Sequence, residues 1–272
     1  MRYNLIIARF SEIAIKSSWV RKRLIRLLVS NINRALKKNR INAKVYSKWD
    51  RIFIETRQIK RSVEVLKHVF GIVSISPVIK TDLKKLEEEI ARHAKLAKNK
   101  SFAVRVKRVG NHPFTSREME VKLGSIIVGK TKSKVDLDEP QITFFVEIRN
   151  EDAYLYFEKI PGPGGKPLGS EGRVVCMIRN KKDLVACWLM MKKGCRVRIY
   201  SKISIKPLKK WMYGKDIKIV SKDEAEELAN HIPIVSGNTL KDGLIESKNI
   251  VFYPLFAMTE KEINEMYRKI NI

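Results

Sequence analysis

Residues 162–194 contain a glycine-rich segment, a buried strand, a short loop and a helix, in that order. The glycine-rich segment is Gly162–Gly172, the apolar run after it covers Val174–Ile178, and an apolar helical run covers Leu184–Lys193. A strand, a short loop and a helix in this order hold nucleotide phosphates at the helix N-terminus in α/β folds. The segment therefore predicts an α/β domain with a nucleotide-binding layout. Glycine and proline also favour a flexible connection between domains, and this second interpretation of Gly162–Gly172 stays open.

The loop between this strand and helix lacks the residues that phosphate-binding loops need. Such loops are rich in glycine because backbone N–H groups must approach the phosphates closely. Here the loop holds no glycine and three cations, in the order Arg179, Asn180, Lys181, Lys182 and Asp183. We therefore expect the scaffold to persist without ATP chemistry and without a bound cofactor. The three cations at a helix N-terminus are well placed to hold an RNA phosphate instead.

The charge balance of the chain favours a polyanionic partner. Its 272 residues include 56 Lys and Arg against 29 Asp and Glu, which gives a net charge of +27 and a pI near 10.0. A domain pI above about 9 is typical of nucleic-acid binders. The alternative is a solvated, thermophile-type surface, but such surfaces usually place Glu beside Lys and form ion-pair networks without a large net charge.

Cysteine spacing and hydropathy argue against several other classes of protein. Cys176, Cys187 and Cys195 form neither a CxxC motif nor paired zinc spacing, so no metal site is expected. Cys176 and Cys187 lie in apolar runs, and we interpret them as buried side chains rather than nucleophiles. No apolar run approaches the roughly 20 residues of a membrane span, and the N-terminus lacks a signal-peptide layout. We therefore expect a cytoplasmic protein with no membrane partner.

The first 60 residues follow a strand–helix–strand–strand pattern. Asn4–Arg9 is predicted to be a strand and Trp19–Lys38 a helix with leucine and isoleucine at helical spacing, and two short strands follow. No acidic residue lies between Glu12 and Asp50. A run of cations without acids repels itself unless a polyanion neutralises it. The candidate RNA-binding residues of this region are Lys16, Arg21, Lys22, Arg23 and Arg26.

The middle of the chain alternates helix and strand patterns. Leu83–Ala97 and Ser116–Val128 are predicted helices, the second with Ser116 as its N-cap. Phe102–Val106 alternates as a half-buried strand, and a hairpin is expected around Asn150. The region holds a second basic cluster that is a candidate phosphate-binding face, with the solvated surface of a helix as the alternative. Its members are Arg105, Lys107, Arg108, Arg117, Lys122, Lys130, Lys132 and Lys134.

Several of these segments resemble the tRNA 4-thiouridine synthetase (tRNA sulfurtransferase) family. The helix end Trp188–Gly194 is similar to the family's Trp-Leu-Met-Met-Lys-Arg-Gly, and Gly162–Gly172 is similar to its Gly-x-Gly-Gly-x-Pro-x-Gly-Ser-x-Gly segment. Residues 9–16 resemble its Arg-x-Gly-Glu-Ile-x-Leu-Lys start, and residues 68–78 resemble the junction in a THUMP domain, an RNA-binding module. Positions 178–183 do not match its Ser-Gly-Gly-x-Asp-Ser loop, which holds ATP while a uridine carbonyl oxygen is adenylated.

The resemblance implies an α/β fold throughout, in three domains. These are a ferredoxin-like N-terminal domain over residues 1–60, a THUMP domain over 61–160, and a shortened Rossmann-like domain of the PP-loop ATPase type over 161–272. It implies a tRNA-binding protein whose degenerate PP-loop leaves no catalytic residue to assign. The alternative is a divergent tRNA sulfurtransferase that makes thiouridine, or its partner subunit. A complete sulfurtransferase paralogue, and a second copy of the chain in a homodimer, are further partners that the resemblance implies.

Overall fold

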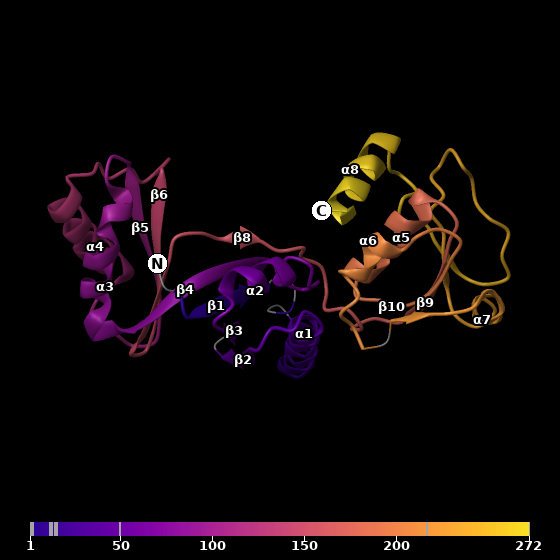
Figure 1. The fold of residues 1–272 in the computed structure, drawn as a ribbon, viewed down its shortest axis with the longest axis horizontal. Coiled ribbons are helices and arrows are strands. Elements are labelled where there is room, and N and C mark those ends of the chain that lie inside the picture. The colour runs from indigo at the N-terminus through magenta and orange to yellow at the C-terminus, as the bar shows by residue number, and fades with distance from the viewer. Residues whose placement is uncertain (1–2, 11–12, 14–15, 49, 216, 272) are drawn as a thin grey trace.

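The computed structural model describes residues 3–10, 13, 16–48, 50–215 and 217–271, and these form three units in a row (Figure 1). The first unit of the chain lies in the middle of this view, with the second unit on its left and the third on its right. Each unit has a buried core of its own. None of the helices in these ranges is long and apolar enough to cross a membrane.

The first unit has a ferredoxin-like βαββαβ arrangement. Its elements are β1 (Leu5–Arg9), α1 (Ser18–Lys38), β2 (Lys44–Lys48), β3 (Arg51–Glu55), α2 (Ile59–Leu66) and β4 (Ser74–Asp82). The strands form an antiparallel sheet in the order β2-β3-β1-β4. α1 buries Leu24, Leu28 and Ile32 because they recur every fourth residue and so share one helix face. The elements predicted here are confirmed to within one residue; of the motif at 9–16, residues 11, 12, 14 and 15 lie outside the described ranges.

Helix α2 belongs to the first unit, although a boundary at residue 60 was expected. Val63 and Leu66 of α2 pack in the same core as Ile6 of β1 and Ile52 of β3. A boundary at residue 60 would cut this helix and expose its apolar face, which costs free energy. We therefore place the end of the first unit inside β4.

The second unit shares β4 and adds the strands and helices up to residue 161. Its elements are η1 (Leu83–Lys85), α3 (Leu86–His93), η2 (Ala94–Ala97), β5 (Phe102–Val109), α4 (Ser116–Thr131), β6 (Ile142–Arg149), β7 (Asp152–Tyr156) and β8 (Ile160–Pro161). The strand order is β4-β7-β6-β5, with β5 and β6 parallel and the other two pairs antiparallel. Ile90 of α3 and Leu123 of α4 pack on Phe102 and Phe144, so both helices cover the same face of the sheet.

Two helices of the second unit differ from the prediction. The single helix expected over residues 83–97 is a short α-helix between two 3-10 turns, although its inward residues are buried as expected. Helix α4 is capped by Thr115 and not by Ser116. The Thr115 hydroxyl accepts a hydrogen bond from the Glu118 N–H at 3.1 Å, and the Glu118 carboxylate accepts one from the Thr115 N–H at 2.6 Å. This reciprocal pair is a capping box, which places Ser116 at the first helical position.

Strand β4 joins the first two units into one sheet of eight strands. Its first half pairs with β1 from Ser74 to Val78, and its second half pairs with β7 from Ile79 to Asp82. One strand of nine residues therefore carries the hydrogen bonds of both units (Figure 1). The two units are held together by a continuous backbone ladder and not by a loose linker.

The third unit is an open, Rossmann-like parallel sheet. Its elements are β9 (Arg173–Ile178), α5 (Lys181–Lys192), β10 (Arg196–Ser201), α6 (Lys206–Lys209), β11 (Lys218–Ile219), α7 (Lys222–Leu228), β12 (Ile234–Val235), β13 (Val251–Phe252) and α8 (Glu260–Asn271). The five strands run parallel in the order β11-β10-β9-β12-β13. α5 and α8 pack on one face of the sheet and α7 on the other. Cys176 and Cys187 are buried in this unit, as predicted, and burial raises the pKa of the Cys176 thiol well above its usual value.

The glycine-rich segment Gly162–Gly172 is packed between the first and third units. The Gly164 N–H donates to the carbonyl oxygen of Ile72 at 2.8 Å, and the Lys166 N–H donates to that of Lys192 at 3.0 Å. The segment is thus bonded to the end of the first unit and to the end of α5. Of the two interpretations of this segment, the flexible connection between domains does not fit these hydrogen bonds, because they fix the segment at both ends.

Candidate nucleic-acid interface and nucleotide loop

The basic residues predicted in the first unit lie on the solvent side of α1 and just before it. Lys22, Arg23 and Arg26 are exposed, Arg21 is half-buried, and Lys16 is exposed ahead of the helix. Residues three or four apart on a helix project from the same side, so Arg26 shares a face with both Lys22 and Arg23. The first turn of α1 contains no acidic residue. The structure therefore brings most of this predicted cluster together.

Trp19 extends this basic face and was not predicted as a functional residue. Its side chain is 69% exposed, and the Arg23 guanidinium lies 5.6 Å from the centre of its ring. A large exposed aromatic side chain beside cations is the arrangement on which nucleic-acid bases stack. The sequence did hold a signal, because Trp19 falls outside the apolar stripe of Leu24 and Leu28. It was interpreted only as the start of a helix.

The basic residues predicted in the second unit fall on two faces rather than one. Arg105 and Lys107 are exposed on β5, and they point away from the face that buries Phe102 and Val104 against α4. Arg108, which is half-buried, donates to the Gly110 carbonyl oxygen at 3.4 Å. The helix side carries the exposed residues Arg117, Lys122, Lys130, Lys132 and Lys134. The cluster predicted as a single phosphate-binding face is therefore divided by the sheet.

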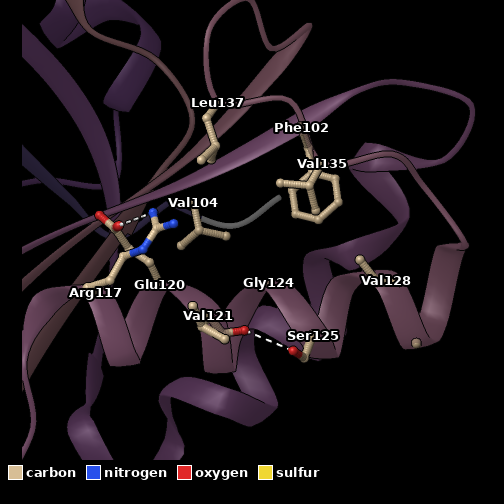
Figure 2. Close-up of a pocket in the computed structure, with 11 residues that line it drawn as sticks. Phe102, Val104, Arg117, Glu120, Val121, Gly124, Ser125, Val128, Val135 and Leu137 are labelled. Carbon is tan, nitrogen blue, oxygen red and sulfur yellow. Dashed lines mark hydrogen bonds and ion pairs between the residues drawn. The ribbon is translucent and has the colours of Figure 1, made fainter.

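The helix side of the second unit contains a pocket of about 450 Å³ between α4 and β5 (Figure 2). Phe102, Val104 and Val121 line it, and Gly124 leaves the helix wall without a side chain at its centre. Arg117 lies at one end, 3.7 Å from the Glu120 carboxylate. The pocket is mostly apolar, and Arg117 is the basic residue among those that line it. The sequence held one signal for this pocket, which is a glycine inside a predicted helix. Glycine weakens a helix, so its presence there indicates that the space beside it is used.

The predicted nucleotide loop is shorter than expected, because α5 begins at Lys181. Asn180 is its N-cap, and the Asn180 side-chain oxygen accepts from the Asp183 N–H at 3.1 Å. The Asp183 carboxylate in turn accepts from the backbone N–H of Arg179 and from that of Gly237, each at 3.0 Å. Backbone N–H groups at a helix N-terminus are the donors that a phosphate would use. Here the Asp183 N–H in the first turn of α5, and the N–H groups of Arg179 and Gly237 beside it, are bonded to the chain's own side chains.

The lysines of this segment are also engaged by protein groups. Lys182 Nζ lies 2.9 Å from the Asp242 carboxylate and 2.7 Å from the Glu260 carboxylate. Hydrogen bonds to Glu260 and Asp242 raise the pKa of Lys182. Lys181 Nζ lies 4.6 Å from the centre of the Tyr267 ring on α8. In this structure Lys181 and Lys182 connect α5 to α8 and to the segment after β12, and a contact of these cations with an RNA phosphate stays a prediction.

Comparison with known proteins agrees with this architecture. Residues 5–76 match the ThiI ferredoxin-like domain and residues 80–158 match the THUMP domain. A probable tRNA sulfurtransferase of Methanobrevibacter smithii is 41% identical over 207 residues, covering 72% of this chain and 53% of the relative. The chain is a THUMP-domain relative of the tRNA sulfurtransferases. The probable tRNA sulfurtransferase of Methanocaldococcus jannaschii is 35% identical over 236 residues, covering 81% of this chain and 61% of the relative.

This chain spans a little over half the length of the curated tRNA sulfurtransferases that it matches. Among solved structures, PH1313 from Pyrococcus horikoshii superimposes with a TM-score of 0.84 at 29% identity, over 99% of this chain and 100% of that one. A 4-thiouridine synthetase in complex with RNA and bound ATP gives a TM-score of 0.80 at 21% identity, over 98% of this chain and 85% of that one. The second likeness shows a shared fold. The predicted family resemblance and the three-part α/β architecture are confirmed.

Proposed function

We propose that this chain binds tRNA through the basic surfaces of its first two units and does not use ATP to adenylate uridine. The observation that carries the first part is the exposed basic face of α1, Lys22, Arg23 and Arg26, beside the exposed ring of Trp19. Cations in this arrangement bind backbone phosphates, while the ring stacks on an unpaired base. The THUMP domain and the relatives named tRNA sulfurtransferase support tRNA as the ligand. Cytoplasmic localisation stays a prediction.

The pocket between α4 and β5 supports the same proposal from the second unit. Proteins select single-stranded RNA by holding unstacked bases in apolar sites with phosphate contacts around them. The walls of Phe102 and Val121 offer such a site, and Lys130, Lys132 and Lys134 lie along the same side of the unit. We infer that an unpaired base enters this pocket. In this proposal the shape of the RNA and its unpaired residues provide the selection, since phosphate contacts carry little sequence information.

The second part of the proposal is carried by the hydrogen bonds of Asp183. Its carboxylate accepts from the N–H groups of Arg179 and Gly237, which flank the start of α5, and the Asn180 side chain accepts from the Asp183 N–H in the first turn of the helix. An incoming ATP phosphate would have to displace a carboxylate of the same charge sign from those donors. The close approach of Gly237 adds to this, because even a Cβ there would collide with the backbone of Asp183. Arg179, Lys181 and Lys182 stay candidates for an RNA phosphate contact, for which Lys182 would have to leave its ion pairs with Asp242 and Glu260.

The alternative function is a divergent tRNA sulfurtransferase or a partner subunit of one. The observation in its favour is that two relatives named probable tRNA sulfurtransferase are 41% and 35% identical to this chain, over 207 and 236 residues. A complete sulfurtransferase paralogue stays a predicted partner. Deletion of the gene in a strain without a paralogue tests this alternative function. Loss of thiolated nucleosides from tRNA supports the alternative, and their persistence supports the proposal above. A homodimer stays a prediction.

The α1 face is tested by a triple variant, Lys22→Gln with Arg23→Gln and Arg26→Gln. We expect weaker binding of bulk tRNA, and a plot of log K against log salt that is shallower by about 0.9 for each phosphate contact removed. The measurement is fluorescence anisotropy across a KCl series. Lys222→Gln on α7 is the control with a charge change far from α1, and it should leave the slope unchanged. A triple variant with the wild-type slope would remove α1 from the interface.

The nucleotide proposal is tested by titrating Mg-ATP into the protein after it has been loaded with bulk tRNA. We expect no saturable heat up to about millimolar ATP, because the Asp183 carboxylate stands at the start of α5 and, with Asn180, holds three backbone N–H groups there. The heat of tRNA binding in the same instrument shows that the protein is folded and competent. A dissociation constant in the micromolar range contradicts the proposal and favours the alternative, a divergent tRNA sulfurtransferase.

A further inference from the structure

Side chains of the first two units form one buried cluster where the units meet. Leu5, Ile7 and Phe53 of the first unit form a buried cluster with Tyr154 and Tyr156 of the second. Phe53 and Tyr154 have ring centres 5.4 Å apart. At one end of this apolar cluster lies a group of charged side chains from both units, which we call the junction cluster: Arg9, Arg51, Lys107, Glu147, Arg149 and Lys159.

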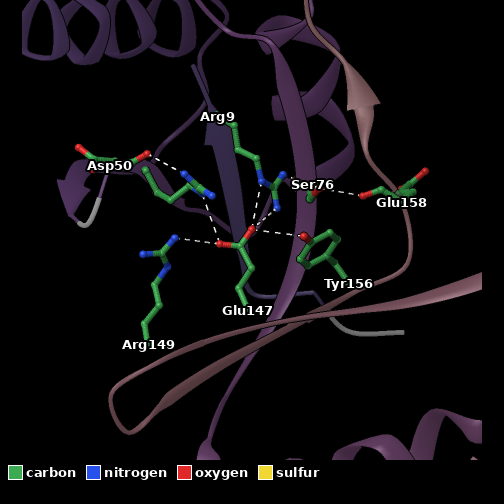
Figure 3. A network of polar contacts seen from close by, with 8 residues as sticks. Arg9, Asp50, Ser76, Glu147, Arg149, Tyr156 and Glu158 are labelled. Atoms are coloured by element: carbon green, nitrogen blue, oxygen red, sulfur yellow. Dashed lines mark hydrogen bonds and ion pairs between the residues drawn. The ribbon is translucent and has the colours of Figure 1, made fainter. Parts of the chain in front are cut away.

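Glu147 is the centre of the junction cluster (Figure 3). Its carboxylate accepts from Arg9 at 2.8 Å and from Arg149 at 3.1 Å, and lies 3.3 Å from Arg51 Nε. Tyr156 donates a further hydrogen bond to it at 3.3 Å. Only 3% of the Glu147 side chain is exposed. One carboxylate thus binds three guanidinium groups that come from β1, β3 and β6.

Two lysines add to this excess of positive charge. Lys107 is the direct neighbour of Glu147 in the register of β5 and β6, and it is exposed. Lys159 is also exposed, and its pKa is lowered by partial burial and by the charge of Arg9. Asp152 does not offset these charges, because it forms an ion pair with Lys80 at 3.1 Å. Among the described residues, five basic groups therefore lie around the single Glu147 carboxylate, and three of them contact it directly.

We propose that the junction cluster is an anion site that binds one backbone phosphate of RNA between the first and second units. The inference rests on the proposed function, because it names where tRNA crosses from one unit to the other. Arg9 and Arg51 keep 13% and 14% of their side chains exposed, and guanidinium groups bind phosphate oxygens in a bidentate manner. Lys107 and Lys159 form the exposed rim through which the phosphate enters. A phosphate there would bring negative charge to a site where, among the described residues, the basic groups outnumber the single Glu147 carboxylate.

The test uses the rim lysines, because both are exposed and neither makes one of the hydrogen bonds or ion pairs to Glu147 described above. The double variant Lys107→Gln with Lys159→Gln should bind bulk tRNA more weakly, on the order of tenfold at low salt, with a salt slope shallower by about 0.9. Lys261→Gln with Lys269→Gln on α8 makes the same change in net charge far from the junction. It should keep the wild-type affinity to within about twofold and the wild-type slope. Urea unfolding of each variant checks that the fold is unchanged.

The outcomes separate this inference from the proposed function. If the wild type binds tRNA, the α1 variant binds it weakly and the junction variant matches the α8 control, the junction site is wrong and the proposed function stands. If the wild type does not bind tRNA, both are wrong. A weaker and less salt-dependent junction variant, with an unchanged α8 control, supports the inference.

Discussion

Replacing Glu147 with glutamine is expected to lower the free energy of unfolding by about 3–5 kcal/mol. The buried carboxylate binds Arg9, Arg51 and Arg149, so its loss leaves three guanidinium groups close together without their shared counterion. Urea unfolding of the full chain near neutral pH measures the effect. Glu88→Gln on the exposed side of α3 is the matched control and should change stability by less than about 0.5 kcal/mol. A loss below about 1 kcal/mol for the Glu147 variant would mean that the network does not hold the units together.

The pH dependence of stability gives the same network a second readout. Burial alone would raise the pKa of Glu147, but Arg9 and Arg51 lower it from 4.5 to about 2. A lowered pKa in the folded state means that the stabilisation is complete above the unfolded value and is lost as pH falls from about 4.5 towards 2. The wild type should therefore lose more stability over this range than the Glu147→Gln variant does. Parallel curves would contradict the assignment.

Replacing Phe70 with alanine should lower the free energy of unfolding by about 3–5 kcal/mol, because it leaves a cavity where the first and third units are in contact. Phe70 follows α2 in the chain but is buried in the core of the third unit. Its ring centre lies 5.6 Å from that of Trp188 and 5.2 Å from that of Trp211. Tryptophan fluorescence should shift to the red as both indoles gain solvent, and urea unfolding gives the free energy.

Phe70→Leu is the matched control for this prediction. Leucine keeps most of the volume, so it should cost less than about 1.5 kcal/mol. Phe252→Ala, at a side chain that is 40% exposed, should leave the fluorescence unchanged. Equal effects of alanine at positions 70 and 252 would show that Phe70 does not join the units.

Most of the elements could be predicted from local pattern. Leu24, Leu28 and Ile32 recur at helical spacing, and α1 follows because one face of a helix must be covered. The start of α5 was missed for a different reason. Asn180 and Asp183 stand three residues apart, which is a helix N-cap signature, but the resemblance to a known loop was given more weight than this local chemistry.

The junction cluster could not have been predicted in the same way. Glu147 alternates with apolar residues along β6, and an acid in that pattern predicts a solvent-facing position. Its partner Arg9 is 138 residues earlier, and only the double pairing of β4 brings the two together. A contact between residues far apart in the sequence produces no recognisable pattern in either local segment. The same holds for Phe70, whose contacts lie in another unit.

The shared strand β4 also fixes the distance between two proposed RNA-binding surfaces. Because the first two units belong to one sheet, the basic face of α1 and the pocket beside α4 keep a constant separation. A rigid pair of contact points accepts only those ligands whose phosphates and unpaired bases have the same spacing. Selection by such a surface acts on the dimensions of a folded RNA, and two tRNAs of different sequence and equal shape would bind alike.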